Sequence, residues 1–225
     1  FLVAAMRTLI NLYAAIIGKI KFLNDRNLSD WLKKTEHEHK SLSYFIKKRI
    51  ITDNLYGVDI MEEATEIAKL RLFLALVASA ESVEQLEPLP NIDFNILAGN
   101  SLIGLMRVTD EEFDRRNAQG HLFRKSYHEV LQEKNRLIDT YRHATTYSQD
   151  LTALRDDIQQ KKQESLATLD DILLGEFKSL EIKFEAVAWD ADENELGKSK
   201  KRALTLEDLH KLHPFHWGYE FDEIL

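Results

Sequence analysis

A short apolar segment that ends in an aspartate and runs directly into a helix places the tightest constraint on the fold. Residues 55–58 are predicted to form a strand, Asp59 closes it, and residues 62–80 have apolar residues at helical spacing. A second short strand is predicted at residues 94–97. Two strands joined by a helix of this length are typical of a βαβ unit, in which the strands are parallel. We therefore predict an α/β fold.

Asp59 is a candidate for holding the ribose of a nucleotide-type cofactor. In open α/β sheets, ligands bind outside the carboxyl ends of the strands, and a carboxylate there can accept hydrogen bonds from the ribose hydroxyls. The alternative is that Asp59 only caps the following helix by accepting a bond from a free backbone N–H. Glu62 and Glu63 give the acidic first turn that is expected of any helix, so both alternatives remain open.

A second turn of similar form comes after the strand at residues 94–97. The strand breaks at Gly99, and the polar pair Asn100 and Ser101 comes next. The alternative to a cofactor contact is a turn residue whose side chain bonds to its own backbone. Two such turns in one chain favour a cofactor-binding edge more strongly than either turn does alone.

Helical segments surround the βαβ unit. Apolar residues recur at helical spacing over residues 1–22, and residues 29–49 form a polar helical region. Residues 50–51 are assigned to the start of the strand that ends at Asp59. The helix at residues 62–80 is dense enough in apolar residues to be buried on most sides, as a crossover helix should be.

The character of the chain changes after residue 108. Residues 109–180 are charged and free of proline, with apolar residues at steps of three and four. This pattern predicts an antiparallel pair of long helices, broken near residues 144–149, with a solvated outer face. Residues 190–202 are polar and predicted as a loop with a basic cluster, and residues 209–221 as a packed aromatic turn.

Composition excludes several classes of function. The chain has no cysteine, which excludes disulfides and thiolate metal sites and fits a reducing cytoplasm. A net charge of −8 argues against the chain as a whole being a nucleic-acid-binding domain. Asn11, Lys19 and Lys21 interrupt the apolar run near the start, so we predict no membrane span there.

No metal site is predicted from the histidines. His37 and His39 are two residues apart and point to different faces of a helix. His210, His213 and His216 lie close together in sequence, but a proline interrupts any helical spacing among them.

Together these segments resemble the adenine-specific DNA methyltransferase region of type IIG-like restriction-modification proteins and related phage-defence proteins. The resemblance depends on the order and combination of four stretches rather than on any one of them. The first stretch is residues 1–5, which resemble the segment directly after the family's Gly-rich cofactor loop. The other three are residues 54–60 with the helix 64–72, residues 91–96 with 99–102, and residues 214–217 with 220–221.

The resemblance implies a partial Rossmann-like methyltransferase fold, with parallel strands and crossover helices and an inserted long antiparallel helical hairpin. It implies S-adenosyl-L-methionine as the cofactor, with Asp59 on the ribose and Ile60 against the adenine. Asn100 would meet the adenine amino edge, with Ser101 and Leu102 beside it. The implied reaction of the parent protein is methyl transfer to N6 of an adenine flipped out of duplex DNA.

The same resemblance predicts a division into three parts. Residues 1–108 would be a partial S-adenosylmethionine-dependent methyltransferase domain, and residues 109–185 the helical hairpin insertion. Residues 186–225 would be a polar loop and a return to the methyltransferase domain.

The departures from the family pattern are as informative as the matches. The Gly-rich loop is absent, and no Asn-Pro-Pro-Tyr motif occurs, since the only prolines are Pro88, Pro90 and Pro214. We therefore expect no catalytic residue in this chain, which would be an internal piece of a longer protein and inactive alone. Double-stranded DNA would be bound through the parent protein, in a bacterial or archaeal cytoplasm, and the oligomeric state stays open.

Two other functions remain to be weighed. A nicotinamide-dependent dehydrogenase would need a Gly-x-Gly-x-x-Gly loop about twenty residues before Asp59, and the first fifty residues contain only Gly18. A non-enzymatic interaction module would use the hairpin at residues 109–180 as its working surface and the α/β part as a scaffold.

Overall fold

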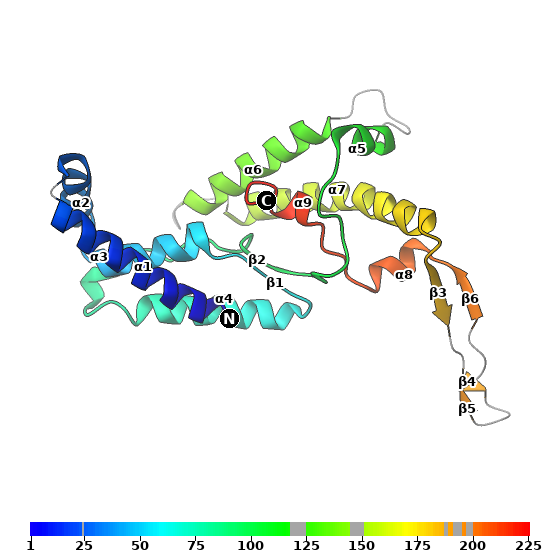
Figure 1. Ribbon diagram of the computed structural model, residues 1–225, viewed down its shortest axis with the longest axis horizontal. Helices are drawn as coiled ribbons and strands as arrows, with labels where there is room; N and C mark the ends of the chain where they lie inside the picture. The colour runs from blue at the N-terminus through cyan, green and yellow to red at the C-terminus, as the bar shows by residue number, and fades with distance from the viewer. Residues whose placement is uncertain (24, 118–124, 145–150, 187–188, 191–194, 197–199) are drawn as a thin grey trace. The chain divides into compact units, whose positions relative to one another are not determined.

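The computed structural model describes the chain apart from residues 24, 118–124, 145–150, 187–188, 191–194 and 197–199. The chain divides into two compact units (Figure 1), each assembled from two separate stretches. Unit 1 comprises Phe1–Ala98 and Ile138–Leu151, and unit 2 comprises Gly99–Leu137 and Thr152–Leu225. The three-part domain division made from the sequence remains a prediction.

Unit 1 is mainly helical and contains one pair of parallel strands. β1 and β2 pair in register from Gly57 opposite Ile96 to Asp59 opposite Ala98, with α4 between them in sequence. The elements are α1 (Leu2–Leu23), α2 (Arg26–Glu38), α3 (Leu42–Arg49), the π-helix η1 (Ile50–Asn54), β1 (Gly57–Asp59), α4 (Glu62–Val77), the 3-10 helix η2 (Val83–Gln85), β2 (Ile96–Ala98) and the end of α6 (Tyr127–His143).

The structure refines one local prediction for unit 1 and contradicts another. The helical region predicted at residues 29–49 is two helices, because His39 is extended and the Ser41 side chain accepts a bond from the first turn of α3. Residues 50–51 belong to the π-helix η1 and not to a strand, and both isoleucines are fully buried. A short apolar run fits a buried helix as well as a buried strand, so periodicity could not separate them.

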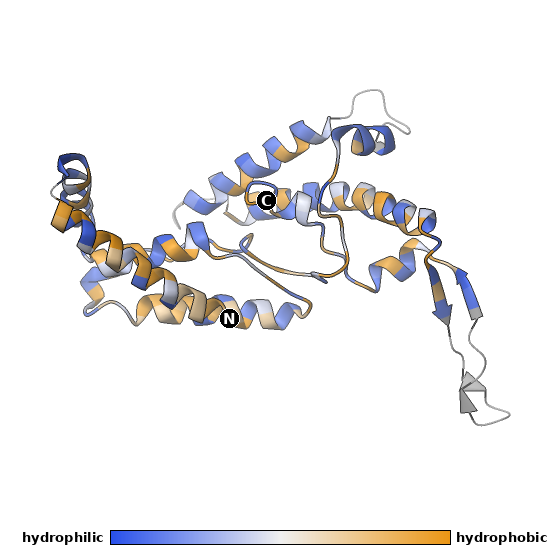
Figure 2. Ribbon diagram, viewed as in Figure 1, coloured by the Kyte–Doolittle hydropathy of each residue, from blue (hydrophilic) through white to orange (hydrophobic). Residues whose placement is uncertain are grey.

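The apolar side chains of α4 divide between two faces. Leu72 and Leu76 are fully buried, whereas Ile67, Leu70 and Leu74 are each more than half exposed. Figure 2 shows the resulting apolar colour along α4. The expectation that this helix is buried on most sides is therefore wrong for the unit as the structure describes it.

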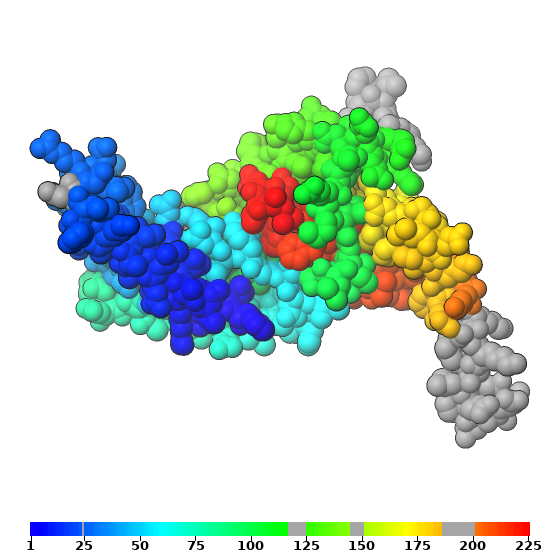
Figure 3. Space-filling view, in the orientation of Figure 1, coloured from blue at the N-terminus to red at the C-terminus, as the bar shows by residue number. Residues whose placement is uncertain are grey.

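Helix α1 forms part of the surface of unit 1 in the space-filling view (Figure 3). Of the helices described, only α1 is long and apolar enough to span a membrane, and 11% of its most apolar window is buried. Core helices of soluble proteins can have the same length and apolar composition. Met6 and Ile20 are buried, so one face of α1 packs within unit 1.

Unit 2 combines helices with a two-stranded ribbon. A separate short helix, α5, precedes the two helices that correspond to the predicted pair, and the break lies largely outside the described residues. The elements are α5 (Asp110–Asn117), the first part of α6, α7 (Leu151–Ser179), β3 (Lys183–Ala186), β4 (Trp189–Asp190), β5 (Glu195–Leu196), β6 (Lys200–Ala203), α8 (Leu206–His210) and α9 (Trp217–Glu220). That α6 and α7 form an inserted hairpin remains a prediction.

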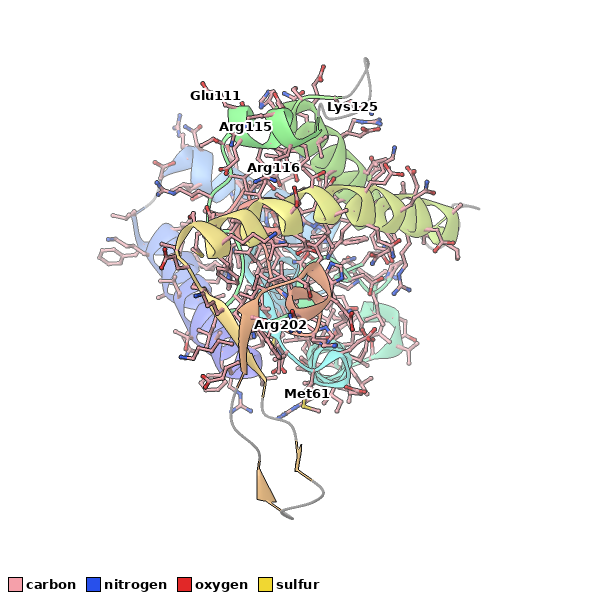
Figure 4. All side chains as sticks on the ribbon, turned by 90° about the vertical axis from the view of Figure 1, so that its right-hand side faces the viewer. Met61, Glu111, Arg115, Arg116, Lys125 and Arg202 are labelled. Carbon is pink, nitrogen blue, oxygen red and sulfur yellow. The ribbon has the colours of Figure 1, made fainter. Side chains whose placement is uncertain are left out.

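The described part of the stretch predicted as a polar loop contains strands. β6 pairs antiparallel with β3, and β5 pairs with β4, so the loop prediction is wrong there. Arg202 holds the base of the ribbon (Figure 4), with its guanidinium 2.6 and 2.7 Å from the two carboxylate oxygens of Asp208. Hydrogen bonds from Arg202 and Thr205 hold the pKa of Asp208 far below its usual range. Of the predicted basic cluster, Lys198 lies outside the described residues.

The core of unit 2 brings residues from α5, α6 and α7 together with the C-terminal segment. Phe113 and Tyr127 are in ring contact, with centroids 4.7 Å apart. The buried members of this core are Leu105, Phe113, Tyr127, Leu169, Ile172, Leu173, Leu174, Leu204, Leu209 and Tyr219.

Candidate cofactor site

Asp59 ends β1 at the edge where β2 also ends, since its register partner is Ala98. The side chain is exposed, and its Oδ1 accepts the backbone N–H of Met61 at 3.0 Å. Among the described residues, no donor bonds to its Oδ2. The alternative, in which Asp59 caps the helix, is wrong, because Met61 is the N-cap of α4 and no side chain caps this helix. The bond from Met61 instead holds the turn before α4, and it occupies one carboxylate oxygen and leaves the other available.

A cavity of about 430 Å³ runs beside β1. Tyr56, Gly57, Val58 and Asp59 all line it, although the side chains of consecutive strand residues point in opposite directions. Ile96 of β2, the register partner of Gly57, also lines the cavity, as do Leu2 of α1 and Ala68 of α4. Arg71 of α4 lines the same cavity, and no sequence signal singled it out.

The neighbouring candidate, Ile60, is 58% exposed. It does not line the cavity beside β1. An apolar side chain held in the open next to a free carboxylate oxygen is available to pack on a flat ring.

The second predicted turn lies at the start of unit 2. The Oδ1 atom of Asn100 accepts the backbone N–H of Leu102 at 3.1 Å, which is the own-backbone bond of the alternative interpretation. The Nδ2 group of Asn100 has no partner among the described residues. Ser101 is exposed and Leu102 is 93% exposed, so this turn also presents unused polar and apolar groups.

This turn continues into a segment that pairs with the aromatic C-terminal segment. Residues 100–105 and 213–218 run alongside each other and include a parallel bridge between Asn100 and Pro214. The backbone N–H···O bonds run from Asn100 to His213 at 2.6 Å, from Phe215 to Ile103 at 2.7 Å, and from Gly218 to Leu105 at 3.1 Å. Residues 99–102 and 214–217, which belong to two different stretches of the family resemblance, are thus adjacent within unit 2.

Glycine is required where these two segments come closest. Gly104 has φ +151°, and a β-carbon there would lie 1.9 Å from the carbonyl oxygen of Phe215. A β-carbon on Gly99 would lie 2.8 Å from the Phe215 ring. The approach of the two backbones therefore depends on the absence of side chains at these positions.

The predicted aromatic turn is confirmed. Trp217 and Phe221 each contact Phe215, with ring centroids 5.0 and 5.5 Å apart. The indole N–H of Trp217 also donates to the carbonyl oxygen of Ser101 at 3.1 Å, so the turn at residues 100–102 rests against this aromatic group.

His216 is completely buried, and both of its ring nitrogens are paired. Its Nδ1 lies 3.3 Å from the backbone nitrogen of Leu105, and its Nε2 lies 3.0 Å from Oδ1 of Asp170. A backbone N–H can only donate, so Nδ1 accepts and Nε2 carries the hydrogen that is donated to the carboxylate. His210 meets the other oxygen of Asp170 at 3.2 Å but is 59% exposed. Sequence reasoning missed Asp170, which lies 46 residues from its partner.

The structure therefore places the candidate residues in two groups. Asp59 and Ile60 end the strand of unit 1, and Asn100, Ser101 and Leu102 form the turn that opens unit 2. Among the residues whose placement is known, no group of three or more histidine, aspartate or glutamate side chains could hold a metal ion.

Sequence comparison decides the family of the chain. The model of the Eco57I restriction-modification methylase family matches residues 53–223. The chain belongs to this family. A Methanocaldococcus jannaschii protein named "Putative type II restriction enzyme and methyltransferase" is 30% identical over 210 residues, which are 81% of this chain and 18% of that protein. No solved structure matches the chain.

Membership of this family confirms the resemblance to a restriction-modification methyltransferase region. It favours that interpretation over a dehydrogenase. The matched residues include all five candidate cofactor contacts. The chain spans about a fifth of the relative's length, so the activity of a whole protein goes beyond what the match itself describes.

Proposed function

We propose that this chain is part of a DNA adenine-N6 methyltransferase that acts in a restriction-modification or phage-defence system. The family match over residues 53–223 is the observation that carries the proposal. The reaction class is methyl transfer to an adenine that has been flipped out of duplex DNA. S-adenosyl-L-methionine, as the cofactor, would supply the methyl group from its sulfonium centre.

The residues at the two strand ends fit the nucleoside part of that cofactor. The free Oδ2 of Asp59 can accept a hydrogen bond from a ribose hydroxyl, and exposed Ile60 can pack on an adenine ring. Asn100 has an unused amide N–H₂ group, which can donate to an acceptor nitrogen on a purine edge. Ser101 and Leu102 would border the same purine. We assign these five residues to cofactor binding and none to catalysis.

The fold that supports this function is a partial Rossmann-like methyltransferase domain. Its evidence is the order β1, α4, β2 with the two strands parallel and ending at one edge. We propose that α6 and α7 form a helical insertion into this domain, with a partner-binding role as the alternative use of that insertion. Because the net charge is −8, we propose that other parts of the parent protein make most of the DNA contact, and we expect that protein to act in the cytoplasm.

The direct test is Asp59→Asn in the full-length natural protein. The asparagine side chain would keep an oxygen for the Met61 N–H but would present an N–H₂ group, a donor, in place of the free carboxylate oxygen. A hydrogen bond to a charged group contributes about 1.5–3 kcal/mol, so we expect KM for S-adenosylmethionine to rise at least about tenfold. Radiolabelled methyl transfer to duplex DNA measures this, with Glu62→Gln at the start of α4 as the matched control.

The identity of the product tests the rest of the proposal. Nucleoside analysis of the methylated DNA should give N6-methyladenine, and methylcytosine would contradict the assignment to adenine. An unchanged KM in Asp59→Asn, with methylation intact, would show that Asp59 only holds the turn before α4.

A further inference from the structure

One link between residues 100–105 and 213–218 comes from a buried side chain and not from a backbone group. Leu105 accepts a bond from the Gly218 N–H through its carbonyl, and donates its own N–H to the ring of His216. Both backbone polar groups of Leu105 are therefore tied to the C-terminal segment. The ring of His216 thus takes the place of a backbone carbonyl in this pairing.

The ring of His216 has a fixed orientation. A flip of the ring would place the Cδ2–H group against the Leu105 N–H and the Cε1–H group against Asp170, so it would break both hydrogen bonds. Asp170, which receives the Nε2 hydrogen, is itself 8% exposed and lies on α7 between the buried side chains of Leu169 and Ile172. Helix α7 thereby sets the position of the ring, and the ring sets the position of Leu105.

We propose that His216 and Asp170 are positioning residues that hold the Asn100–Leu102 turn in place for the adenine of the cofactor. This inference rests on the proposed function of that turn. The chain from Leu105 back to Asn100 is short, and the Asn100 carbonyl is already bonded to the Ile103 N–H. A shift of Leu105 is therefore transmitted directly to the turn.

The two histidines that share Asp170 provide a matched comparison. His216 has no exposed surface, whereas the His210 side chain is 59% exposed at the other carboxylate oxygen. A contact made by a side chain this exposed is screened by solvent and contributes little to structure. Only the buried histidine is bonded to the backbone that leads to the turn.

The experiment compares His216→Ala, Asp170→Ala, Asp170→Asn and His210→Ala in the full-length natural protein. Asp170→Asn keeps a side-chain oxygen that can accept the Nε2 hydrogen, so this variant should rescue the position of the ring. We expect KM for S-adenosylmethionine to rise at least about tenfold in the two disruptive variants, with kcat changed by less than about threefold. Asp170→Asn and His210→Ala should stay within about threefold of the wild type in both constants.

A second measurement is independent of activity. Amide hydrogen exchange in a peptide covering residues 99–106 should become faster in His216→Ala and Asp170→Ala, and should be unchanged in Asp170→Asn and His210→Ala. All kinetic assays are made well below the melting temperature of each variant, so that loss of folded protein does not count as loss of affinity. If His216→Ala does not fold, the contrast between the two Asp170 variants decides the question.

The outcomes separate this inference from the proposed function. A lower melting temperature with wild-type KM and wild-type exchange at residues 99–106 would overturn the inference and leave Asp170 and His216 as packing residues. A wild-type protein that transfers no methyl group from S-adenosylmethionine to DNA would overturn the proposed function, while the exchange data would still show whether the pair positions the turn.

Discussion

The carbonyl oxygen of Phe215 occupies the space that a β-carbon at position 104 would need. Gly104→Ala would place that atom 1.9 Å from the oxygen, at a φ of +151° that side chains rarely adopt. Strain of this kind costs about 1–3 kcal/mol before the steric clash is added. We expect Gly104→Ala to lower the free energy of unfolding by more than about 3 kcal/mol, measured by urea denaturation.

Gly18→Ala is the matched control for that substitution. Gly18 is exposed in α1, and a β-carbon there would meet nothing within 4 Å. Alanine in a helix interior is more stable than glycine by about 0.5–1 kcal/mol, so this variant should be slightly more stable than the wild type. Equal effects at the two positions would contradict the close approach of residues 104 and 215.

Glu87 is a residue of unit 1 whose environment makes stability depend on pH. Burial alone would raise the pKa of Glu87, but hydrogen bonds and charges from His39 and Lys48 outweigh it and lower the pKa below its ordinary value. A carboxylate whose pKa is lower in the folded state than in the unfolded state stabilises the fold at pH values above its unfolded-state pKa, which is about 4.3. That stability is lost as the pH falls through the lower folded-state pKa.

The prediction is that Glu87→Gln removes part of the acid sensitivity of unit 1. Between about pH 5 and pH 3, the wild type should lose more unfolding free energy than the variant, and near neutral pH the wild type should be the more stable of the two. Urea denaturation across this range measures both. Parallel pH profiles would show that the contacts of Glu87 with His39 and Lys48 contribute nothing.

At the scale of elements, α4 allows burial to be tested on two neighbouring leucines. Leu72 is fully buried and Leu74 is 59% exposed. Truncating a buried leucine to alanine costs about 2–5 kcal/mol, because it removes apolar contact and leaves a cavity. We expect that loss for Leu72→Ala and less than about 1 kcal/mol for Leu74→Ala, measured by thermal or urea denaturation. A large cost at Leu74 would mean that the exposed face of α4 is covered.

Elements with a local hydrophobic pattern could be predicted from the sequence, and elements that depend on distant partners could not. The strand before Asp59, the helix α4 and the strand before Gly99 each lie within a few residues of their predicted positions. β6 carries Lys200, Lys201 and Arg202 and lacks the apolar alternation of a typical strand. It forms because it pairs with β3 and because the Arg202 guanidinium is anchored on Asp208.

The same limit applied to the candidate site. Asp59 and Asn100 could be identified because each follows a short strand, and a polar residue at a strand end is a local signal. The bond between Leu105 and His216 joins residues 111 positions apart, and no spacing rule predicts it. Burial of a histidine becomes visible only once its partners from other elements are known.

At the scale of the whole molecule, the chain lacks the Gly-rich loop that the resemblance assigns to the methionine end of the cofactor. We therefore expect the isolated 225-residue chain to bind S-adenosylmethionine weakly or not at all and to methylate no DNA. Titration calorimetry measures the affinity, with the full-length natural protein as the positive control. Micromolar affinity in the isolated chain would contradict this expectation.

The division into two units has a consequence for how the chain is made. Unit 1 needs Ile138–Leu151 as well as the first 98 residues, and unit 2 needs both Gly99–Leu137 and the C-terminal segment. Domains generally fold as units while the ribosome synthesises the chain from its N-terminus. We therefore expect the nascent chain to carry an unfinished unit 1 until its second stretch has been synthesised, and a single proteolytic cut would release neither unit whole.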